Sequence, residues 1–305
     1  TLSSSSAASD VYKRQALISL IVAAVLVGLA VWAIVIERQL YVVRQQSIKV
    51  LPKGSSPIRL LQIGDIHLAP WQKNKMRFLR SLGQREIDLV VNTGDNLGHK
   101  NAIEPLLEAL GPLLTKPGVF VHGSNDYFAP VAKNPFGYLF HSSAKPKSGA
   151  LNTEELTKGF ESAGWVNLNN RFKDIEVSGS RIRFLGIDDY HIGYAKFDLL
   201  VPSDHFSIAL THAPYMEAIE KLTGFGAQLI FAGHTHGGQV RLPLVGALTT
   251  NSDLPNKFAR GISGWEFEGR TSVLSVVAGL GNSIFAPVRF FCRPEVREIT
   301  LLAKD

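Results

Sequence analysis

The chain contains 305 residues, of which 45% are hydrophobic and 19% are charged, so it is long enough to bury the core of one large domain. Its formal net charge of +6 favours anionic partners such as phosphate esters or anionic lipids, although a modest surplus spread along a chain is more often a solvated surface. Cys292 is the only cysteine, which excludes an intrachain disulfide and a multi-cysteine structural zinc site.

The N-terminal region predicts a membrane anchor. Residues 1–15 lack an initiating methionine and are rich in serine and alanine, so we interpret them as a non-native or disordered segment and exclude them from the fold prediction. Residues 16–36 carry no charge over a length sufficient to cross a bilayer core of about 30 Å. We therefore predict a transmembrane helix at 16–36. A cleaved signal peptide is the alternative, but its apolar region would be shorter and would end in a small-x-small site.

The same region leaves the membrane side open. Arg38, Arg44 and Lys49 follow the helix, but the residues ahead of it are not a fair comparison for the positive-inside rule. One helix followed by a large domain favours a single-pass protein of the cell membrane with an extracytoplasmic domain. We predict a juxtamembrane linker at 37–57 and one large domain at 58–305.

Short apolar runs alternate with amphipathic segments along the rest of the chain. The runs predict strands at 58–63, 89–93, 118–122, 181–187, 206–211, 227–232 and 271–278. Helices are predicted near 74–83, 102–114, 153–163 and 214–223. This alternation is typical of an α/β domain with buried sheets covered by helices.

Polar motifs follow five of these strands directly. They are DIH at 65–67, GDN at 94–96, GSND at 123–126, THAP at 211–214 and GHTHGG at 233–238. Loops beyond the carboxyl ends of strands converge in open α/β sheets, so the five motifs are expected to meet. Carboxylate, amide and imidazole groups together suit divalent ions such as manganese, iron or zinc. A lone Asp-x-His is weak evidence, whereas two histidines on a glycine-flanked loop are much stronger.

The ordered set of motifs resembles the calcineurin-like metallophosphoesterase superfamily, whose pattern runs D-x-H, G-D, G-N-H-[DE], H and G-H-x-H. The match spans residues 58–239. The last motif, GHTHGGQ, is similar to the YkuE-type branch of membrane-anchored or exported bacterial enzymes, and the tail AGLGNSIFAPVRFFCRPEV resembles its actinobacterial members. The resemblance implies a four-layer αββα sandwich, an α+β arrangement of two mixed sheets flanked by helices, preceded here by the transmembrane helix.

The resemblance also implies two divalent metal ions and a ligand set for each. One ion would be held by Asp65, His67 and His236 and the other by Asn125, His212 and His234, with Asp95 bridging both. Two ions about 3.5 to 4 Å apart repel each other, and a shared carboxylate offsets that repulsion. The implied reaction is hydrolysis of phosphomonoesters or phosphodiesters by a hydroxide that bridges the ions.

The third motif departs from the family pattern, since G-N-H-[DE] is written here Gly123-Ser124-Asn125-Asp126. An ungapped alignment places Ser124 at the asparagine ligand, and a one-residue shift restores Asn125. We prefer the shift, because a serine hydroxyl is a poor neutral donor for a divalent ion. Either way the motif histidine is absent, and general acids are worth about 100- to 10,000-fold in rate.

The missing histidine leaves three possibilities open. Another residue, such as His122 or His191, supplies the proton to the leaving group. Otherwise the leaving group departs with little help, or turnover is slow. His122, which stands at a strand end, is more often structural than catalytic at such a position. We carry it as a catalytic candidate together with Asp95 and Asn125.

Further residues invite a functional and a structural interpretation. Asp188 and Asp189 either orient a ligand imidazole or form a turn, which we favour. Arg289 and Arg293 either clamp a phosphate or form surface ion pairs. The segment 127–149 interleaves aromatic residues with lysines, so it is either a flap on the lipid interface or an ordinary surface loop, which is the commoner case.

The predicted function is therefore a membrane-anchored phosphoesterase, with a lipid or envelope substrate as one option. A catalytically weak or inactive metal-binding scaffold on the same fold is the alternative, because the motif histidine is missing. No nucleic-acid partner is expected, since the sequence shows neither a basic stripe nor an aromatic stacking platform.

Overall fold

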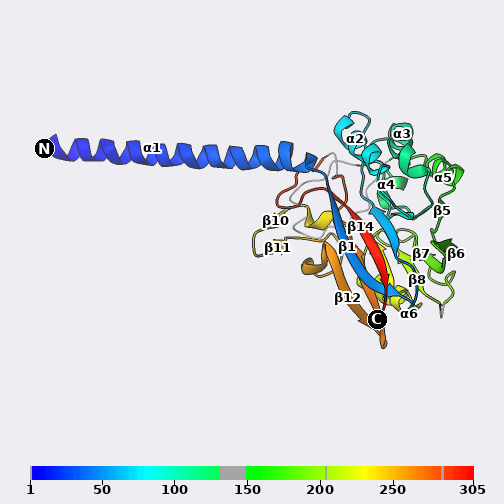
Figure 1. The fold of residues 1–305 in the computed structure, drawn as a ribbon. Coiled ribbons are helices and arrows are strands. Elements are labelled where there is room, and N and C mark those ends of the chain that lie inside the picture. The colour runs from blue at the N-terminus through cyan, green and yellow to red at the C-terminus, as the bar shows by residue number, and fades with distance from the viewer. Residues whose placement is uncertain (1, 131–148, 203–204, 283–284) are drawn as a thin grey trace.

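The computed structural model describes residues 2–130, 149–202, 205–282 and 285–305. Two six-stranded sheets form the centre of the domain, and a long helix leaves it on one side (Figure 1). The first sheet has the order β1-β14-β2-β3-β4-β5. Its strands are β1 (Val42–Leu51), β2 (Ile58–Ile63), β3 (Leu89–Asn92), β4 (Gly118–Phe120), β5 (Val166–Asn167) and β14 (Glu295–Ala303).

The second sheet has the order β12-β13-β9-β8-β7-β6. Its strands are β6 (Arg171–Val177), β7 (Ser180–Gly186), β8 (Ser207–Leu210), β9 (Leu229–Ala232), β12 (Gly261–Phe267) and β13 (Arg270–Val276). Each sheet is mixed. In the first, β2, β3, β4 and β5 run parallel, and β14 and β1 run antiparallel to them. In the second, β7, β8, β9 and β13 run parallel between the antiparallel edges β6 and β12. A small hairpin, β10 (Arg241–Leu242) and β11 (Gly246–Ala247), stands apart from both sheets.

Helices cover the outer faces of the sheets. They are α2 (Lys73–Leu82), α3 (Ile103–Leu114), α4 (Ser124–Tyr127), α5 (Thr153–Ser162) and α6 (Met216–Gly224), with short 3-10 turns η4 (His236–Gly238) and η5 (Asn256–Phe258). Strand β2 shows how the layers arise, because successive side chains of a strand face opposite sides. Leu61 and Ile63 pack with α2, α3 and α5, whereas Ile58 and Leu60 pack against the second sheet. A third core joins the second sheet to α6. The fold is thus the expected four-layer αββα sandwich.

The N-terminal helix α1 (Leu2–Val31) continues into the short turns η1 (Trp32–Ile36) and η2 (Glu37–Gln39). Among the described residues it is the one helix long and apolar enough to cross a membrane, with a candidate span of Ser9–Gln39 and a mean hydropathy of 2.8. It fits a single-pass membrane protein, and a signal sequence meets the same test. The helix also includes residues 2–15, which the sequence suggested were disordered.

Most of the predicted elements are confirmed, since all seven strands and all four helices form within a few residues of the predicted bounds. The predicted linker at 37–57 differs most, because it contains β1. Residues 42–51 pair in parallel with β14 and bury Ile48, Val50 and Leu51 in the core between the sheets. The segment 127–149, for which a flap and an ordinary surface loop were the two interpretations, lies mostly outside the described residues.

Candidate metal centre

The five polar motifs meet at one edge of the two sheets, at the carboxyl ends of β2, β3, β4, β8 and β9. Asp65 and His67 follow β2, Asp95 follows β3 and Asn125 follows β4 on the short helix α4. The second sheet contributes His212 after β8, and His234 and His236 after β9. The strands place these loops together because their parallel ends coincide, as the sequence predicted.

One cluster joins Asp65, His67 and His236, whose ligand atoms lie within 4.8 Å of one another. The two imidazole Nε2 atoms are 3.2 Å apart, and His236 Nε2 is 3.8 Å from the Asp65 carboxylate. These three side chains are the ones predicted for the first ion. Asp65 also holds the glycine-flanked loop, because its carboxylate accepts the backbone N–H of His234 at 2.9 Å.

A second cluster joins Asp65, Asp95 and His212. Asp65 is common to both clusters, and the Asp95 carboxylate of the second also reaches the first, with its Oδ2 atom 3.3 Å from His67 Nε2 and 3.5 Å from His212 Nε2. His234 completes this side, since its Nδ1 atom is 3.2 Å from His212 Nε2. The central position of Asp95 is the position that a bridging carboxylate needs.

Asn125 reaches the same carboxylate. Its backbone N–H donates to Asp95 Oδ1 at 2.7 Å, and its side-chain amide donates to Asp95 Oδ2 at 2.7 Å. The structure thus brings Asn125 to the ligand set, as the shifted alignment requires. Ser124, the ungapped alternative, lies 3.5 Å from the Asn125 amide.

Backbone carbonyl oxygens orient the imidazole rings. His212 Nδ1 is 2.8 Å from the oxygen of Thr93, and His236 Nδ1 is 3.0 Å from the oxygen of Gly281. His234 Nε2 is 3.0 Å from the oxygen of Asn251. A carbonyl only accepts, so each of these nitrogens carries the proton. The opposite nitrogen of each ring then faces the centre, which is the arrangement that metal-binding histidines require.

The electrostatics of the centre also suit a cation. Asp65 and Asp95 are almost completely buried, and every ion pair described for them is with a histidine. Burial raises the pKa of Asp65 to about 7, and it lowers the pKa of His67 to about 4 and that of His234 to about 3. Two imidazoles are therefore neutral at neutral pH, the form that binds metal. The donor set fits a divalent ion.

The backbone of the loops is unusual. Five of the seven predicted ligand residues adopt a left-handed conformation, with φ of 45° at Asp65, 42° at His67, 54° at Asp95, 67° at His234 and 50° at His236. Asp and His visit this region more readily than most residues, but at a cost of about 1 kcal/mol or more each. Such strain clusters at functional sites, where it aims side chains inward.

A family model, that of the calcineurin-like phosphoesterases, matches residues 58–238. The chain belongs to this family. The match begins at β2 and ends in the loop of His234 and His236, so it covers all the loops that form the centre. Calcineurin-like phosphoesterases are metal-dependent hydrolases, and the predicted family is confirmed.

Two similar bacterial proteins agree with this assignment. The uncharacterized metallophosphoesterase YkuE of Bacillus subtilis is 25% identical over 83% of this chain and 82% of its own length. The UDP-2,3-diacylglucosamine pyrophosphatase LpxG of Chlamydia muridarum is 25% identical over 78% of this chain and 82% of its own. Among solved structures, TT1561 of Thermus thermophilus is 12% identical, covers 74% of this chain and 91% of its own, and has a TM-score of 0.38.

Within this calcineurin-like fold, the two candidate proton donors lie in different places. His122 is buried; its Nε2 is 2.7 Å from the Thr157 hydroxyl and its Nδ1 is 3.5 Å from Asp126. His191 is exposed, its Nδ1 is 2.7 Å from the Tyr215 hydroxyl, and its ring centroid is 4.8 Å from that of His234.

The paired aspartates lead into a turn at 190–193. Asp189 Oδ1 accepts the backbone N–H of His191 at 2.7 Å, and the Asp188 carboxylate accepts the Tyr127 hydroxyl at 2.8 Å. Burial raises the pKa of Asp189 to about 6.

Neither interpretation of Arg289 is correct. Its guanidinium is completely buried and donates to the carbonyl oxygens of Ala278, Gly281 and Cys292, so it is neither a surface ion pair nor a phosphate clamp. The same carbonyl oxygen of Gly281 orients the ring of His236, so Arg289 helps to position this candidate ligand indirectly. Arg293 donates to the carbonyl oxygen of Leu40 at 2.9 Å.

Sequence reasoning missed the connection between the second and third motifs. The Asp126 carboxylate accepts the backbone N–H of Asn96 at 2.8 Å, the Asn96 amide at 3.1 Å and the backbone N–H of Gly123 at 3.1 Å. These bonds fix the loop of Asp95 against the loop of Asn125. The polar residues inside the motifs were the available signal.

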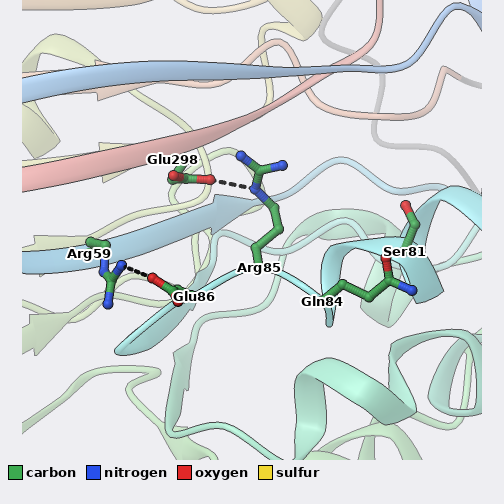
Figure 2. Close-up of a pocket in the computed structure, with 6 residues that line it drawn as sticks. All are labelled: Arg59, Ser81, Gln84, Arg85, Glu86 and Glu298. Atoms are coloured by element: carbon green, nitrogen blue, oxygen red, sulfur yellow. Dashed lines mark hydrogen bonds and ion pairs between the residues drawn. The ribbon is translucent and has the colours of Figure 1, made fainter.

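A pocket of about 430 Å³ lies away from the metal centre, at the amino end of β2 (Figure 2). Both arginines of the pocket form ion pairs within it, Arg59 with Glu86 and Arg85 with Glu298. Arg59 and Asp65 stand at opposite ends of the strand, so this pocket takes no part in the centre.

Proposed function

We propose that this chain is a dinuclear metal-dependent phosphoesterase, anchored in the cell membrane by residues 16–36, that hydrolyses phosphomonoesters or phosphodiesters. The observation that supports it best is the position of the Asp95 carboxylate, which lies within 3.5 Å of imidazole nitrogens on both sides. Asp65, His67 and His236 would hold one ion, and Asn125, His212 and His234 the other. We propose manganese, iron or zinc as the ions.

Two bound ions would supply an activated water and positive charge for the phosphoryl oxygens. The protein's own contribution is positioning. Carbonyl oxygens hold the rings of His212, His234 and His236 in fixed tautomers, and Asn125 holds the bridging carboxylate. Preorganised groups of this kind need little rearrangement when a substrate binds.

The full-length chain in detergent tests this proposal directly. It would be stripped of metal and supplied with manganese, and hydrolysis of bis(p-nitrophenyl) phosphate and p-nitrophenyl phosphate would be measured. We expect activity to return with manganese and to be lost in Asp95→Ala. The ratio of the two rates separates diesterase from monoesterase activity.

The same assay tests the scaffold alternative. Under the ungapped alignment, Asn125 stands at the position where the family has a histidine. The absence of that histidine is the specific reason to consider a loss of catalysis. Full manganese occupancy without turnover of either ester would establish the scaffold. Manganese stoichiometry, measured by elemental analysis, distinguishes one bound ion from two.

We also propose that the substrate is linked to a lipid and that the catalytic domain lies outside the cytoplasm. The relative LpxG is named for UDP-2,3-diacylglucosamine, a substrate that carries acyl chains, and α1 fits a single-pass anchor. Protease treatment of intact cells tests the side: digestion of the domain in intact cells supports the proposal, and protection until lysis contradicts it.

A further inference from the structure

The end of the membrane helix is built into the catalytic domain. Glu37 is buried, and its carboxylate accepts the backbone N–H groups of Phe291 at 3.0 Å and Cys292 at 2.6 Å. The backbone N–H of Arg289 donates to the carbonyl oxygen of Ala33 at 3.0 Å. Removal of the helix as a signal peptide after this point would break these bonds. The contacts therefore favour an anchor that stays attached.

The segment 289–292 connects this anchor to the β10–β11 hairpin. Phe290 forms a parallel bridge with Val240, its N–H donates to the oxygen of Gln239 at 3.1 Å, and its oxygen accepts the N–H of Arg241 at 2.9 Å. The hairpin is thereby fixed beside the point where α1 leaves the domain (Figure 1). It also follows directly after the ligand His236 in the chain.

The hairpin and its neighbour present apolar side chains to the outside. Leu244 is fully exposed and Val245 is 69% exposed at the tip, while Phe291 is 56% exposed beside the anchor. Leu242 and Leu248 are also exposed. Consecutive exposed apolar residues at a loop tip are uncommon on soluble surfaces and mark contact with a partner or a membrane.

The segment 290–291 links the hairpin to the exposed apolar end of the anchor, since Phe290 pairs with Val240 and the Phe291 N–H donates to Glu37. The last turns of the helix expose Ile34, Val35 and Ile36, and the bonds of Glu37 hold Phe291 next to them. The position of the hairpin identifies the partner, because β10–β11 lies on the side of the domain from which α1 leaves (Figure 1), where a bilayer that holds the anchor would meet it.

The other side of the anchor exit carries the groups that favour a lipid headgroup layer. A pocket of about 270 Å³ there is lined by Arg38, Trp71 and Lys73 among others. The Asn74 amide donates to Gln39 at 2.7 Å and fixes α2 against the anchor. Tryptophan and basic residues are enriched where a protein meets anionic headgroups.

We propose that the hairpin tip at 242–248 and Phe291 insert into the interface of the bilayer that holds α1. The domain then has a second attachment to the membrane, and the loop of His234 and His236 is held at the level of the headgroups. This inference rests on the membrane anchoring in the proposed function and is independent of the proposed hydrolysis.

Spin labels on the full-length chain in vesicles of phosphatidylcholine and phosphatidylglycerol test it. Three variants each carry a single label, at Leu244→Cys, at Leu26→Cys within the helix, or at Glu268→Cys. Glu268 lies at the tip of the β12–β13 hairpin, at the end of β13 opposite the metal centre, and is exposed. The native Cys292 is buried, so the wild-type chain gives the background. Collisions with oxygen, which concentrates in lipid, are compared with collisions with a water-soluble nickel chelate.

We expect the labels at 26 and 244 to collide with oxygen several-fold more than with nickel, and the label at 268 to show the reverse. A label at 244 that resembles the one at 268, with 26 in lipid, overturns the inference and leaves the anchor intact. A label at 26 in water overturns both. Spin–spin broadening at 244 would assign the surface to a second copy of the chain and also overturn the inference.

Discussion

Gly123 lies against the Asp95 carboxylate, and Gly123→Ala probes the centre without removing a candidate ligand. An added Cβ would stand 2.3 Å from Asp95 Oδ1 and 2.7 Å from the ring of His212, whereas ordinary contacts begin near 3.4 Å. The φ of Gly123 is −113°, so alanine itself causes no backbone strain. The carboxylate must therefore move by about 1 Å, which is the difference between an ordinary contact of about 3.4 Å and the 2.3 Å that the added Cβ would leave.

A displacement of about 1 Å at a reacting centre costs on the order of 100-fold in rate. Weakened support of a ligand costs about 10- to 100-fold in metal affinity, and overpacking costs about 1 to 3 kcal/mol of stability. The measurements are metal content by elemental analysis, hydrolysis of bis(p-nitrophenyl) phosphate and the melting temperature, on the full-length chain in detergent.

Gly264→Ala is the matched control, because Gly264 lies in β12 with no atom within 4 Å of its added Cβ. It should keep wild-type metal content and rate. If Gly123→Ala also keeps both, the close approach does not position Asp95 and the reasoning is refuted.

Three further predictions concern residues around the centre. His122→Ala should leave the metal content intact and slow the hydrolysis of alkyl phosphates more than that of nitrophenyl esters. An unchanged rate for alkyl phosphates would remove His122 from the mechanism. His191→Ala, assayed in parallel, tests the other candidate proton donor. Glu37→Ala removes the acceptor of three N–H groups, those of Phe291, Cys292 and the Trp32 indole, where the N-terminal helix meets the domain, so unfolding should become easier by about 1 to 3 kcal/mol. Glu108→Ala, which breaks an exposed ion pair, should leave the melting temperature unchanged, and equal effects of the two would contradict the role of Glu37. Leu51→Ala should cost about 2 to 5 kcal/mol because Leu51 is completely buried, and a loss below about 1 kcal/mol would show that β1 adds little to the core.

The sequence predicted the central strands because each is a short, mostly apolar run between turn residues. It missed β6, where Arg171, Lys173 and Glu176 are exposed at a sheet edge, and β1 and β14, where polar residues interrupt the apolar ones. β6 and β1 are edge strands, which need only one buried face, whereas β14 lies inside its sheet and carries the buried charged residues Glu295 and Arg297. The pairing of β1 with β14 is also invisible locally, since it joins distant parts of the chain.

The candidate site was predictable as far as its side chains go, because carboxylates and imidazoles at strand ends have a recognisable pattern. The groups that orient them are mostly backbone carbonyls, such as those of Thr93, Asn251 and Gly281, and a carbonyl leaves no mark on the sequence. Arg289 was misread for the same reason, since its partners are carbonyls rather than charges.

The strand order of the first sheet delays its completion during synthesis of the chain. Strand β14 lies between β1 and β2, yet it is made about 250 residues after β1. At about 5 to 20 residues per second, β1 and β2 wait roughly 12 to 50 seconds for the strand that separates them. Throughout that interval the facing edges of β1 and β2 are open to incorrect pairing, while α1 is already available to the membrane. A chain released shortly before Glu295 would lack the strand that closes its first sheet.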